Sequence, residues 1–379
     1  MRFRVERDVL AEAVAWAARS LPARPPVPVL AGLMLSADTD AAGRLVLSSF
    51  DYEVSARVEI TADVTEPGVV LVSGRLLADI TRSLPARPVE VATDGAKVVV
   101  TCGSSRFTLL TLPVEDYPTL PEMPGASGSL RGDLFAAAVG QVSIAAGRDD
   151  TLPVLTGVRL EIEAEKITMA ATDRYRLAVR DLAWTPEQAG LSAIALVPAR
   201  TLADTAKSLA SADKVTVALA SGGTGEGLVG FEGSGRRTTS RLLDGEFPKY
   251  KSLLPAESAS VATVETAGLV ESVRRVALVA ERNTPIRLSF SGGEVTLEAG
   301  SGDEAQASES LDAGLTGDDI SIAFNPAYLL DGLGVLDAAY AELRFTASTR
   351  PAVLAAKDSM DATAGDDYRY LLMPVRLSG

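Results

Sequence analysis

Three adjacent pairs of aspartates are the first residues that could do chemistry. Asp149-Asp150, Asp318-Asp319 and Asp366-Asp367 each place two carboxylates side by side, which could hold a divalent cation or share a proton during hydrolysis. Each pair falls in a segment that we predict to be a loop, where charged residues are mostly solvated. Asn325-Pro326 is predicted to begin a helix, with Asn at the N-cap and Pro at the first helical position.

The chain contains no histidine. Ser-His-Asp and Cys-His catalysis are therefore excluded, and so is the commonest metal ligand. The glycine-rich segment 221–227 is not followed by the Gly-Lys-Ser/Thr of a phosphate-binding loop. We therefore expect no catalytic site, no metal and no cofactor, and we keep a carboxylate-dependent hydrolase as an alternative.

Composition indicates an intracellular globular protein. The 379 residues are 47% hydrophobic, which suits two to three domains, and no apolar run reaches the roughly 18 residues of a membrane span. A single cysteine, Cys102, and a charged start at Arg2, Arg4 and Glu6 favour a reducing cytoplasm without secretion. The net charge of −14 should repel nucleic acid unless the basic residues gather on one surface.

The sequence repeats three times with a period of about 125 residues, the length of a domain. Each repeat begins with a predicted amphipathic helix, at 8–19, 133–145 and 268–280, and contains a second helix carrying a Leu-x-Asp pattern. The predicted buried faces of the first helices are Leu10, Ala13, Val14 and Ala17, then Leu134, Ala138 and Val142, then Leu269, Val273, Val276 and Ala280. The Leu-x-Asp patterns are Leu77/Asp79, Leu202/Asp204 and Leu329/Asp331.

Hairpins follow the first helices. In the clearest one, Val158, Leu160 and Ile162 alternate with polar residues before a turn at Glu165-Lys166, which indicates strands with one buried face. We predict an α+β fold of three homologous domains, each with two helices packed on antiparallel sheets of roughly eight strands. The domains are predicted at residues 1–122, 128–254 and 255–379, and the last strand at 368–375.

Several motifs carry a family resemblance. The hairpin entry Pro153-Val154-Leu155-Thr156-Gly157, its exit Ala171–Leu177, the start 24–30 and the end Tyr370–Leu377 resemble the bacterial sliding clamp, the beta subunit of DNA polymerase III. The resemblance spans the whole chain. It implies a DNA clamp fold and a head-to-tail homodimeric ring around double-stranded DNA, without sequence readout. It further implies a cytoplasmic, nucleoid-associated protein that does not bind membranes and has no reaction of its own. A structural repeat protein without a nucleic-acid role stays open as a second alternative.

The resemblance implies a groove that binds peptides of the replicative polymerase, the clamp loader and other proteins with a clamp-binding motif. Arg176 and Thr172 are expected to offer donors to the peptide backbone. Arg174-Tyr175 stands where the family often has Gly-His. The matching positions are Leu155, Thr172, Arg174, Tyr175, Arg176, Leu177, Pro248, Leu253, Asn325, Tyr328, Met373, Pro374, Val375, Arg376 and Leu377.

Two further surfaces are expected. Basic residues at equivalent repeat positions, Arg75 with Arg200 and Arg82 with Lys207, predict one positive surface toward DNA phosphates. The expected DNA-facing residues are Arg24, Arg75, Arg82, Arg148, Arg200, Lys207, Arg274, Arg275 and Arg282. The expected dimer interface joins Phe107 of one chain to Arg275, Ala277 and Leu278 of the other.

Overall fold

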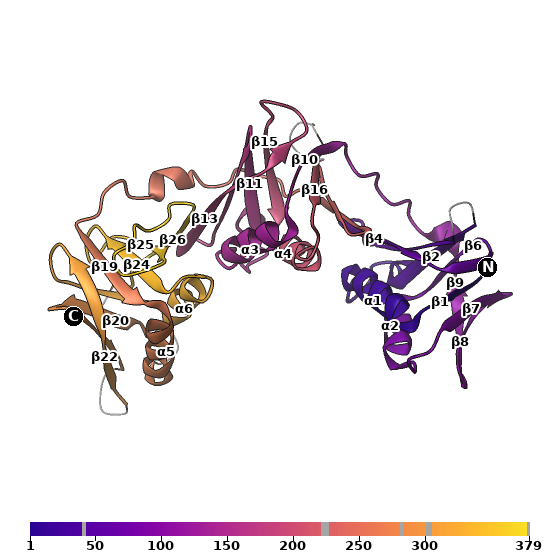
Figure 1. The fold of residues 1–379 in the computed structure, drawn as a ribbon, viewed down its shortest axis with the longest axis horizontal. Helices are drawn as coiled ribbons and strands as arrows, with labels where there is room; N and C mark the ends of the chain where they lie inside the picture. Colours follow the sequence, from indigo (N-terminus) through magenta and orange to yellow (C-terminus); the bar gives the residue numbers. More distant parts are fainter. Residues whose placement is uncertain (40–42, 221–226, 281–283, 301–304, 377–379) are drawn as a thin grey trace. The chain divides into compact units, whose positions relative to one another are not determined.

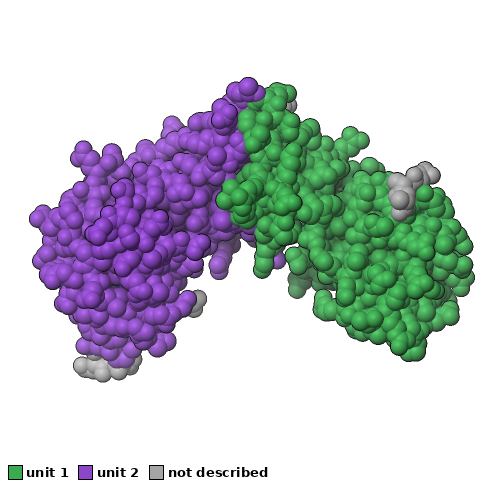
Figure 2. All heavy atoms as spheres, viewed as in Figure 1, with its two compact units in different colours: residues 1–135, 185–188, 204–242 green, residues 136–184, 189–203, 243–379 purple. Residues whose placement is uncertain are grey.

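The computed structural model describes residues 1–39, 43–220, 227–280, 284–300 and 305–376. The chain divides into two compact units (Figures 1 and 2). Unit 1 comprises residues 1–135, 185–188 and 204–242, and unit 2 comprises residues 136–184, 189–203 and 243–379. Within the described residues, no helix is long and apolar enough to cross a membrane.

All six predicted helices are present. In unit 1, α1 and α2 pack against each other and α1 covers strands of the sheet; in unit 2, α5 and α6 form the corresponding pair (Figure 1). The predicted apolar face of α1 is buried, and so are Leu269, Val273 and Val276 of α5, as the periodicity predicted. The helices are α1 (Arg7–Ala17), α2 (Gly74–Ser83), α3 (Gly132–Ser143), α4 (Ala199–Ser208), α5 (Thr266–Val276) and α6 (Pro326–Gly334).

The buried face of α3 differs from the prediction. Leu134 is 48% exposed, whereas Phe135 is 1% exposed and stacks on Phe231 with 5.4 Å between ring centroids. The helix is apolar almost all round, so its periodicity does not single out one face, and the larger aromatic ring takes the buried position. In the third repeat the first helix was predicted to extend to Ala280, but this residue lies beyond the end of α5 and is only partly buried.

Unit 1 holds one continuous antiparallel sheet. Its order is β14-β10-β16-β17-β18-β4-β3-β2-β6-β9-β8-β7-β1-β5. The pairing of β18 with β4 joins the predicted first and second domains. The strands are β1 (Arg2–Val5), β2 (Gly32–Asp38), β3 (Arg44–Phe50), β4 (Val54–Thr61), β5 (Asp63–Glu66), β6 (Gly68–Ser73), β7 (Val89–Asp94), β8 (Lys97–Cys102), β9 (Ser105–Leu112), β10 (Ala126–Leu130), β14 (Thr185–Pro186), β16 (Val215–Leu219), β17 (Leu228–Gly233) and β18 (Arg236–Arg241).

Unit 2 holds the second antiparallel sheet. Its order is β15-β11-β12-β13-β26-β25-β24-β19-β22-β21-β20-β23. Here β13 pairs with β26, which joins the predicted second and third domains. The strands are β11 (Gly157–Glu163), β12 (Lys166–Thr172), β13 (Arg176–Ala183), β15 (Ser192–Pro198), β19 (Ser260–Glu265), β20 (Ile286–Ser291), β21 (Glu294–Ala299), β22 (Ala307–Thr316), β23 (Ile320–Phe324), β24 (Tyr340–Phe345), β25 (Ala352–Lys357) and β26 (Tyr368–Leu372).

Two details of the strands correct the predictions. The register of β11 and β12 sets Glu163 opposite Lys166, so the turn is Ala164-Glu165, one residue earlier than predicted, with Ala164 at a φ of 53°. The last strand ends at Leu372 and not at Val375. Pro374 has no amide hydrogen to continue a ladder, and the Val375 amide turns to the Ala323 carbonyl instead.

The strand β12 is buried on both faces, whereas alternation predicted one. Ala170 and Leu177 lie in an apolar cluster with Phe247 and Tyr250, which belong to the chain segment between β18 and β19. This segment supplies the second apolar layer in unit 2. Part of the glycine-rich segment, residues 221–226, lies outside the described residues.

Candidate functional site

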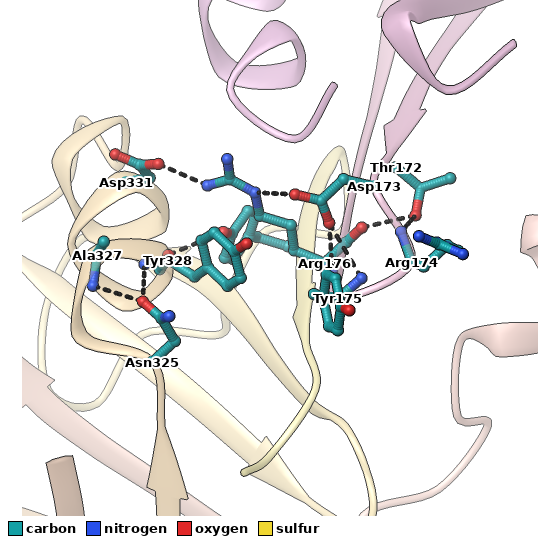
Figure 3. Close-up of polar contacts among 10 residues, drawn as sticks. Thr172, Asp173, Arg174, Tyr175, Arg176, Asn325, Ala327, Tyr328 and Asp331 are labelled. Atoms are coloured by element: carbon teal, nitrogen blue, oxygen red, sulfur yellow. Dashed lines mark hydrogen bonds and ion pairs between the residues drawn. The ribbon is translucent and has the colours of Figure 1, made fainter. Parts of the chain in front are cut away.

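A cavity of about 710 Å³ opens in unit 2. Three pieces of chain line it: the stretch after α3, the turn between β12 and β13, and the first turns of α6. Figure 3 shows the side chains of the turn and of α6. Its lining residues are Ala146, Gly147, Arg148, Asp149, Leu152, Leu155, Asp173, Arg174, Tyr175, Arg176, Ala327, Tyr328 and Asp331.

The turn between β12 and β13 is held by its own polar groups. The Asp173 Oδ1 atom accepts hydrogen bonds from the amides of Tyr175 (3.0 Å) and Arg176 (3.1 Å). The Thr172 hydroxyl donates to the Arg176 carbonyl (2.6 Å) and accepts from the Arg174 amide (3.2 Å). These bonds stabilise Arg174 at a φ of 79°, a region that side chains other than glycine rarely adopt.

Arg176 is the most constrained side chain of the site and is only 5% exposed. Its Nε donates to Asp173 Oδ2 (3.0 Å) and its NH1 to Asp331 Oδ2 (2.5 Å). Its guanidinium also lies over the Tyr328 ring, 4.4 Å from the centroid (Figure 3). Burial alone would lower the pKa of Arg176, but Asp331, Tyr370 and Asp173 outweigh it and raise that pKa.

Two tyrosines form the aromatic wall. The rings of Tyr175 and Tyr328 stack with 6.2 Å between centroids. Asn325 caps α6 by accepting from the amides of Ala327 (2.9 Å) and Tyr328 (3.3 Å), as its sequence position predicted. Burial raises the pKa of Tyr328, with a contribution from the nearby Asp173 carboxylate. Tyr328 is therefore a neutral, oriented ring.

Part of the cavity lining is charged. Asp149 accepts from the Thr151 hydroxyl (2.6 Å) and amide (3.0 Å). The Thr151 hydroxyl and amide, helped by Arg174, lower the pKa of the Asp149 carboxyl. Arg148 also lines the cavity, although it was expected to face DNA. The aspartate pairs at 149, 318 and 366 all lie in loops, and the described residues contain no acidic or Cys/His cluster suited to a metal.

The structure brings together only part of the predicted groove. Leu155, Arg174, Tyr175, Arg176 and Tyr328 line the cavity. Thr172 and Leu177 are buried behind it, and the hydroxyl of Thr172 and the two bonded guanidinium nitrogens of Arg176 are already engaged. Pro248, Leu253 and the segment 373–376 do not line the cavity, Asn325 serves as a cap, and Leu377 lies outside the described residues.

The C-terminal segment nevertheless lies beside the site. The Met373 amide donates to the Tyr175 carbonyl (2.9 Å), and Leu372 pairs with Arg176. Sequence reasoning missed Asp173 and Asp331 as site residues. Asp331 is the aspartate of the third Leu-x-Asp pattern, but the pattern does not distinguish it from Asp79 or Asp204.

The predicted basic residues differ in their partners. Arg75 donates to the Pro22 carbonyl (3.2 Å), and Arg82 pairs with Asp79 at 3.7 Å. Arg274 pairs with Glu271 and Arg275 with Glu309. Arg24, Arg200 and Lys207 are exposed and have no carboxylate partner among the described residues, and Arg282 lies outside them.

The predicted interface residues lie in both units. Phe107 is partly buried against the core of unit 1. Its strand β9 pairs with β8 from Ser105 to Leu110 but with β6 only at Thr111 and Leu112. In unit 2, Leu278 is 84% exposed and Ala277 is partly buried. Both units therefore present groups that a second chain could cover.

Comparison with known proteins identifies the family of the chain. Models of the N-terminal, central and C-terminal domains of the DNA polymerase III beta subunit match residues 1–121, 129–249 and 251–376. The chain is 66% identical to the beta sliding clamp of Streptomyces coelicolor over all of both chains. It is 50% identical to the beta sliding clamp homolog GriR of Streptomyces muensis over 99% of each.

Solved structures agree in fold. A Pseudomonas aeruginosa sliding clamp bound to griselimycin matches with a TM-score of 0.90 at 29% identity, and the Bacillus subtilis DNA polymerase sliding clamp with 0.90 at 25% identity; each match covers all of both chains. The α+β architecture with antiparallel sheets is thus confirmed as the sliding-clamp fold. The chain belongs to the DNA polymerase III beta subunit family, the bacterial beta sliding clamps.

Proposed function

We propose that this DNA polymerase III beta sliding clamp acts as a head-to-tail homodimeric ring that encircles duplex DNA. The ring tethers the replicative polymerase, and the clamp loader and other proteins with clamp-binding motifs use the same site. The three domains are proposed at 1–122, 128–254 and 255–379, which the ranges of the three family models support.

The cavity of unit 2 is the proposed peptide site. Leu152, Leu155 and the stacked rings of Tyr175 and Tyr328 offer apolar surface for a peptide side chain. Two exposed guanidiniums on the rim, Arg148 and Arg174, offer donors to peptide carbonyls. The observation that carries the proposal is a cavity whose wall is fixed by a buried arginine between two carboxylates.

In this proposal Arg176 orients the site and is not itself a peptide donor. Its bonds to Asp173 and Asp331 tie the β12–β13 turn to α6 and keep Tyr328 against the guanidinium face. The surrounding positions Pro248, Leu253 and 373–376 form an outer part of the groove that a longer peptide would reach. Leu177 supports the groove from behind.

The DNA contacts are proposed to be phosphate contacts without sequence readout. Arg24, Arg200 and Lys207 support this best, because their charges have no carboxylate partner among the described residues. The proposed interface brings the incompletely paired strand β9, with Phe107, to the surface around Leu278 of the second chain, because pairing would cover an open strand edge.

We also propose that the protein acts in the cytoplasm, at the nucleoid, and has no catalytic site of its own. The absence of histidine supports the lack of a catalytic site, because it excludes Ser-His-Asp and Cys-His catalysis. The comparisons give no support to a carboxylate-dependent hydrolase or to a structural protein without a DNA role.

Topology tests the proposal. The protein, loaded on nicked circular DNA and washed at high salt, is expected to be retained on circles and lost when the DNA is cut, because a ring slides off an end. Light scattering should give the mass of a dimer. Equal retention on circular and linear DNA would contradict encirclement.

A further inference from the structure

A closed group of five side chains holds the chain segment between β18 and β19 on the sheet of unit 2. Glu161 on β11 pairs with Arg159 on the same strand and with Lys251 of the segment, both at 2.7 Å. Arg159 lies over the Phe247 ring and Lys251 over the Tyr250 ring, each 6.0 Å from the centroid. The two rings meet edge to face at 6.1 Å. Each of the five side chains, which we call the linker latch, therefore contacts two others.

Glu161 is the one anionic member of the linker latch. It is only 7% exposed, and its two carboxylate oxygens pair with different cations. Burial would raise the pKa of Glu161, but Lys251 and Arg159 outweigh it and lower that pKa. Because a buried carboxylate is costly without its partners, Glu161 holds Lys251, and with it the segment, against the sheet.

The two rings of the linker latch also enter the core of unit 2. Phe247 and Tyr250 are 4% and 3% exposed and belong to the same apolar cluster as Leu177 and Leu371. Leu177 is the neighbour of Arg176 on β13, and side chains alternate along a strand. One face of this strand thus supports the linker latch, while the other directs Arg176 to the cavity wall.

Exposed residues of the segment lie between those of the linker latch. Pro248 is exposed between the buried rings of Phe247 and Tyr250, and Leu253, which is 51% exposed, follows Lys251 by two residues. The Tyr250 amide donates to the Pro248 carbonyl (2.7 Å), which makes this turn compact. The linker latch therefore determines where the exposed Pro248 and Leu253 side chains lie.

We propose that Glu161 and Lys251 are positioning residues of the peptide site. The inference rests on the proposed function, in which Pro248 and Leu253 form the outer part of the groove. The ion pair does not touch the peptide. It holds the segment so that Leu253 meets an apolar residue of a peptide that extends beyond the cavity. The cavity wall does not need this pair, because Arg176 is bound by other carboxylates.

Peptide titrations of the full-length chain test the proposal. A fluorescein-labelled polymerase peptide that carries the clamp-binding motif should bind Lys251→Met about fivefold more weakly than the wild type, because methionine cannot pair with Glu161. Lys251→Arg keeps the positive charge and should restore the affinity. The matched control is Lys249→Met, which removes a charge from the same turn. Lys249 has no carboxylate partner in the described chain, so this variant should bind as the wild type does.

A double-mutant cycle separates positioning from general stabilisation. Leu253→Ala should weaken peptide binding in the wild type but add little in Lys251→Met, where Leu253 is already displaced. Leu155→Ala alters the cavity and should have its full effect in both backgrounds. The melting temperature of Lys251→Met should stay within about 3 °C of the wild type, because the Lys251 side chain is mostly exposed.

The outcomes distinguish this inference from the proposed function. Wild-type affinity in Lys251→Met, or additive effects of Lys251→Met and Leu253→Ala, would overturn the positioning role and leave the peptide site in place. Equal weakening by Lys249→Met would reveal a general charge effect and would overturn it as well. If the wild type itself does not bind the peptide, the proposed function fails, and this inference fails with it.

Discussion

The same turn occurs in both units with different outcomes. In unit 1, Asp51 Oδ1 accepts from the amides of Glu53 (2.9 Å) and Val54 (2.7 Å), and Tyr52 has a φ of 75°. In unit 2, Asp173 accepts from the amides two and three residues on, and Arg174 has a φ of 79°. Both turns leave one strand of a hairpin and enter the next, so the repeat has kept the backbone geometry.

The side chains around the turns differ. In unit 1 the turn is fastened by Tyr117, whose hydroxyl accepts from the Phe50 amide (2.7 Å), and the position after Glu53 is the apolar Val54. In unit 2 that position is Arg176, clasped by Asp173 and Asp331. The turn in unit 2 thus forms one wall of a cavity, because Arg176 binds a carboxylate 155 residues further along the chain.

Replacing the residue after the turn should give the largest difference between the units. Arg176→Ala leaves Asp173 and Asp331 without their buried partner, so we expect a loss of about 3 kcal/mol in the free energy of unfolding. Polymerase-peptide affinity should fall at least tenfold. Fluorescence polarisation and thermal melts measure both effects.

The control is the equivalent change in unit 1. Val54→Ala should cost about 1 kcal/mol and leave peptide affinity unchanged. Trp184 in unit 2 and Trp16 in unit 1 report the two melts separately in variants that keep only one tryptophan. A folded Arg176→Ala protein with wild-type affinity would remove Arg176 from the site.

The repeated aspartate provides the second comparison. Asp331→Asn should reduce stability by about 1 kcal/mol, because Asp173 still holds Arg176 and Asp331 is partly solvated. Asp204→Asn, at the same place in α4, should change stability by less than about 0.5 kcal/mol. A double-mutant cycle of Arg176→Ala with Asp331→Asn should show coupling; additive effects would mean that the bond contributes nothing.

The two turn residues with positive φ, Arg174 and Tyr52, provide the third comparison. In Arg174→Gly, glycine adopts the positive φ without strain, but it also makes the unfolded chain more flexible. These effects oppose each other, so we expect the free energy of unfolding to rise by between zero and about 1 kcal/mol. Tyr52→Gly also loses an edge-to-face contact with Phe50 at 5.7 Å and should be destabilising. Urea titrations of both variants test this, and equal effects would show that the contact between Tyr52 and Phe50 adds nothing to stability.

The smallest effect concerns pH. Burial raises the pKa of Tyr117 from 10.0 to about 12, opposed by the Phe50 amide and aided by Asp51. The neutral phenol is therefore favoured in the folded state, and its contribution is complete below pH 10 and is lost as pH rises toward 12. Trp16 emission in Tyr117→Phe should show a shallower loss of stability over that range; an unchanged slope would contradict the assignment.

The helices and hairpins followed from the sequence because local patterns determine them. Leu-x-Asp spacing and strand alternation are properties of short segments. The Arg176–Asp331 bond was not predictable, since it joins a turn to a helix that only the tertiary fold brings together. Glu161 is similar: alternation placed it outward, yet it is 7% exposed because Arg159 and Lys251 pair with it.

The most direct test of the account is to find where a polymerase peptide binds. A peptide carrying the clamp-binding motif of the polymerase and a photoreactive group should crosslink to residues 146–155, 173–176 and 327–331. The yield should fall in Arg176→Ala and not in Val54→Ala. Crosslinks concentrated in unit 1, around residues 50–54, or an undiminished yield in Arg176→Ala would contradict the central claim that the unit 2 cavity is the peptide site.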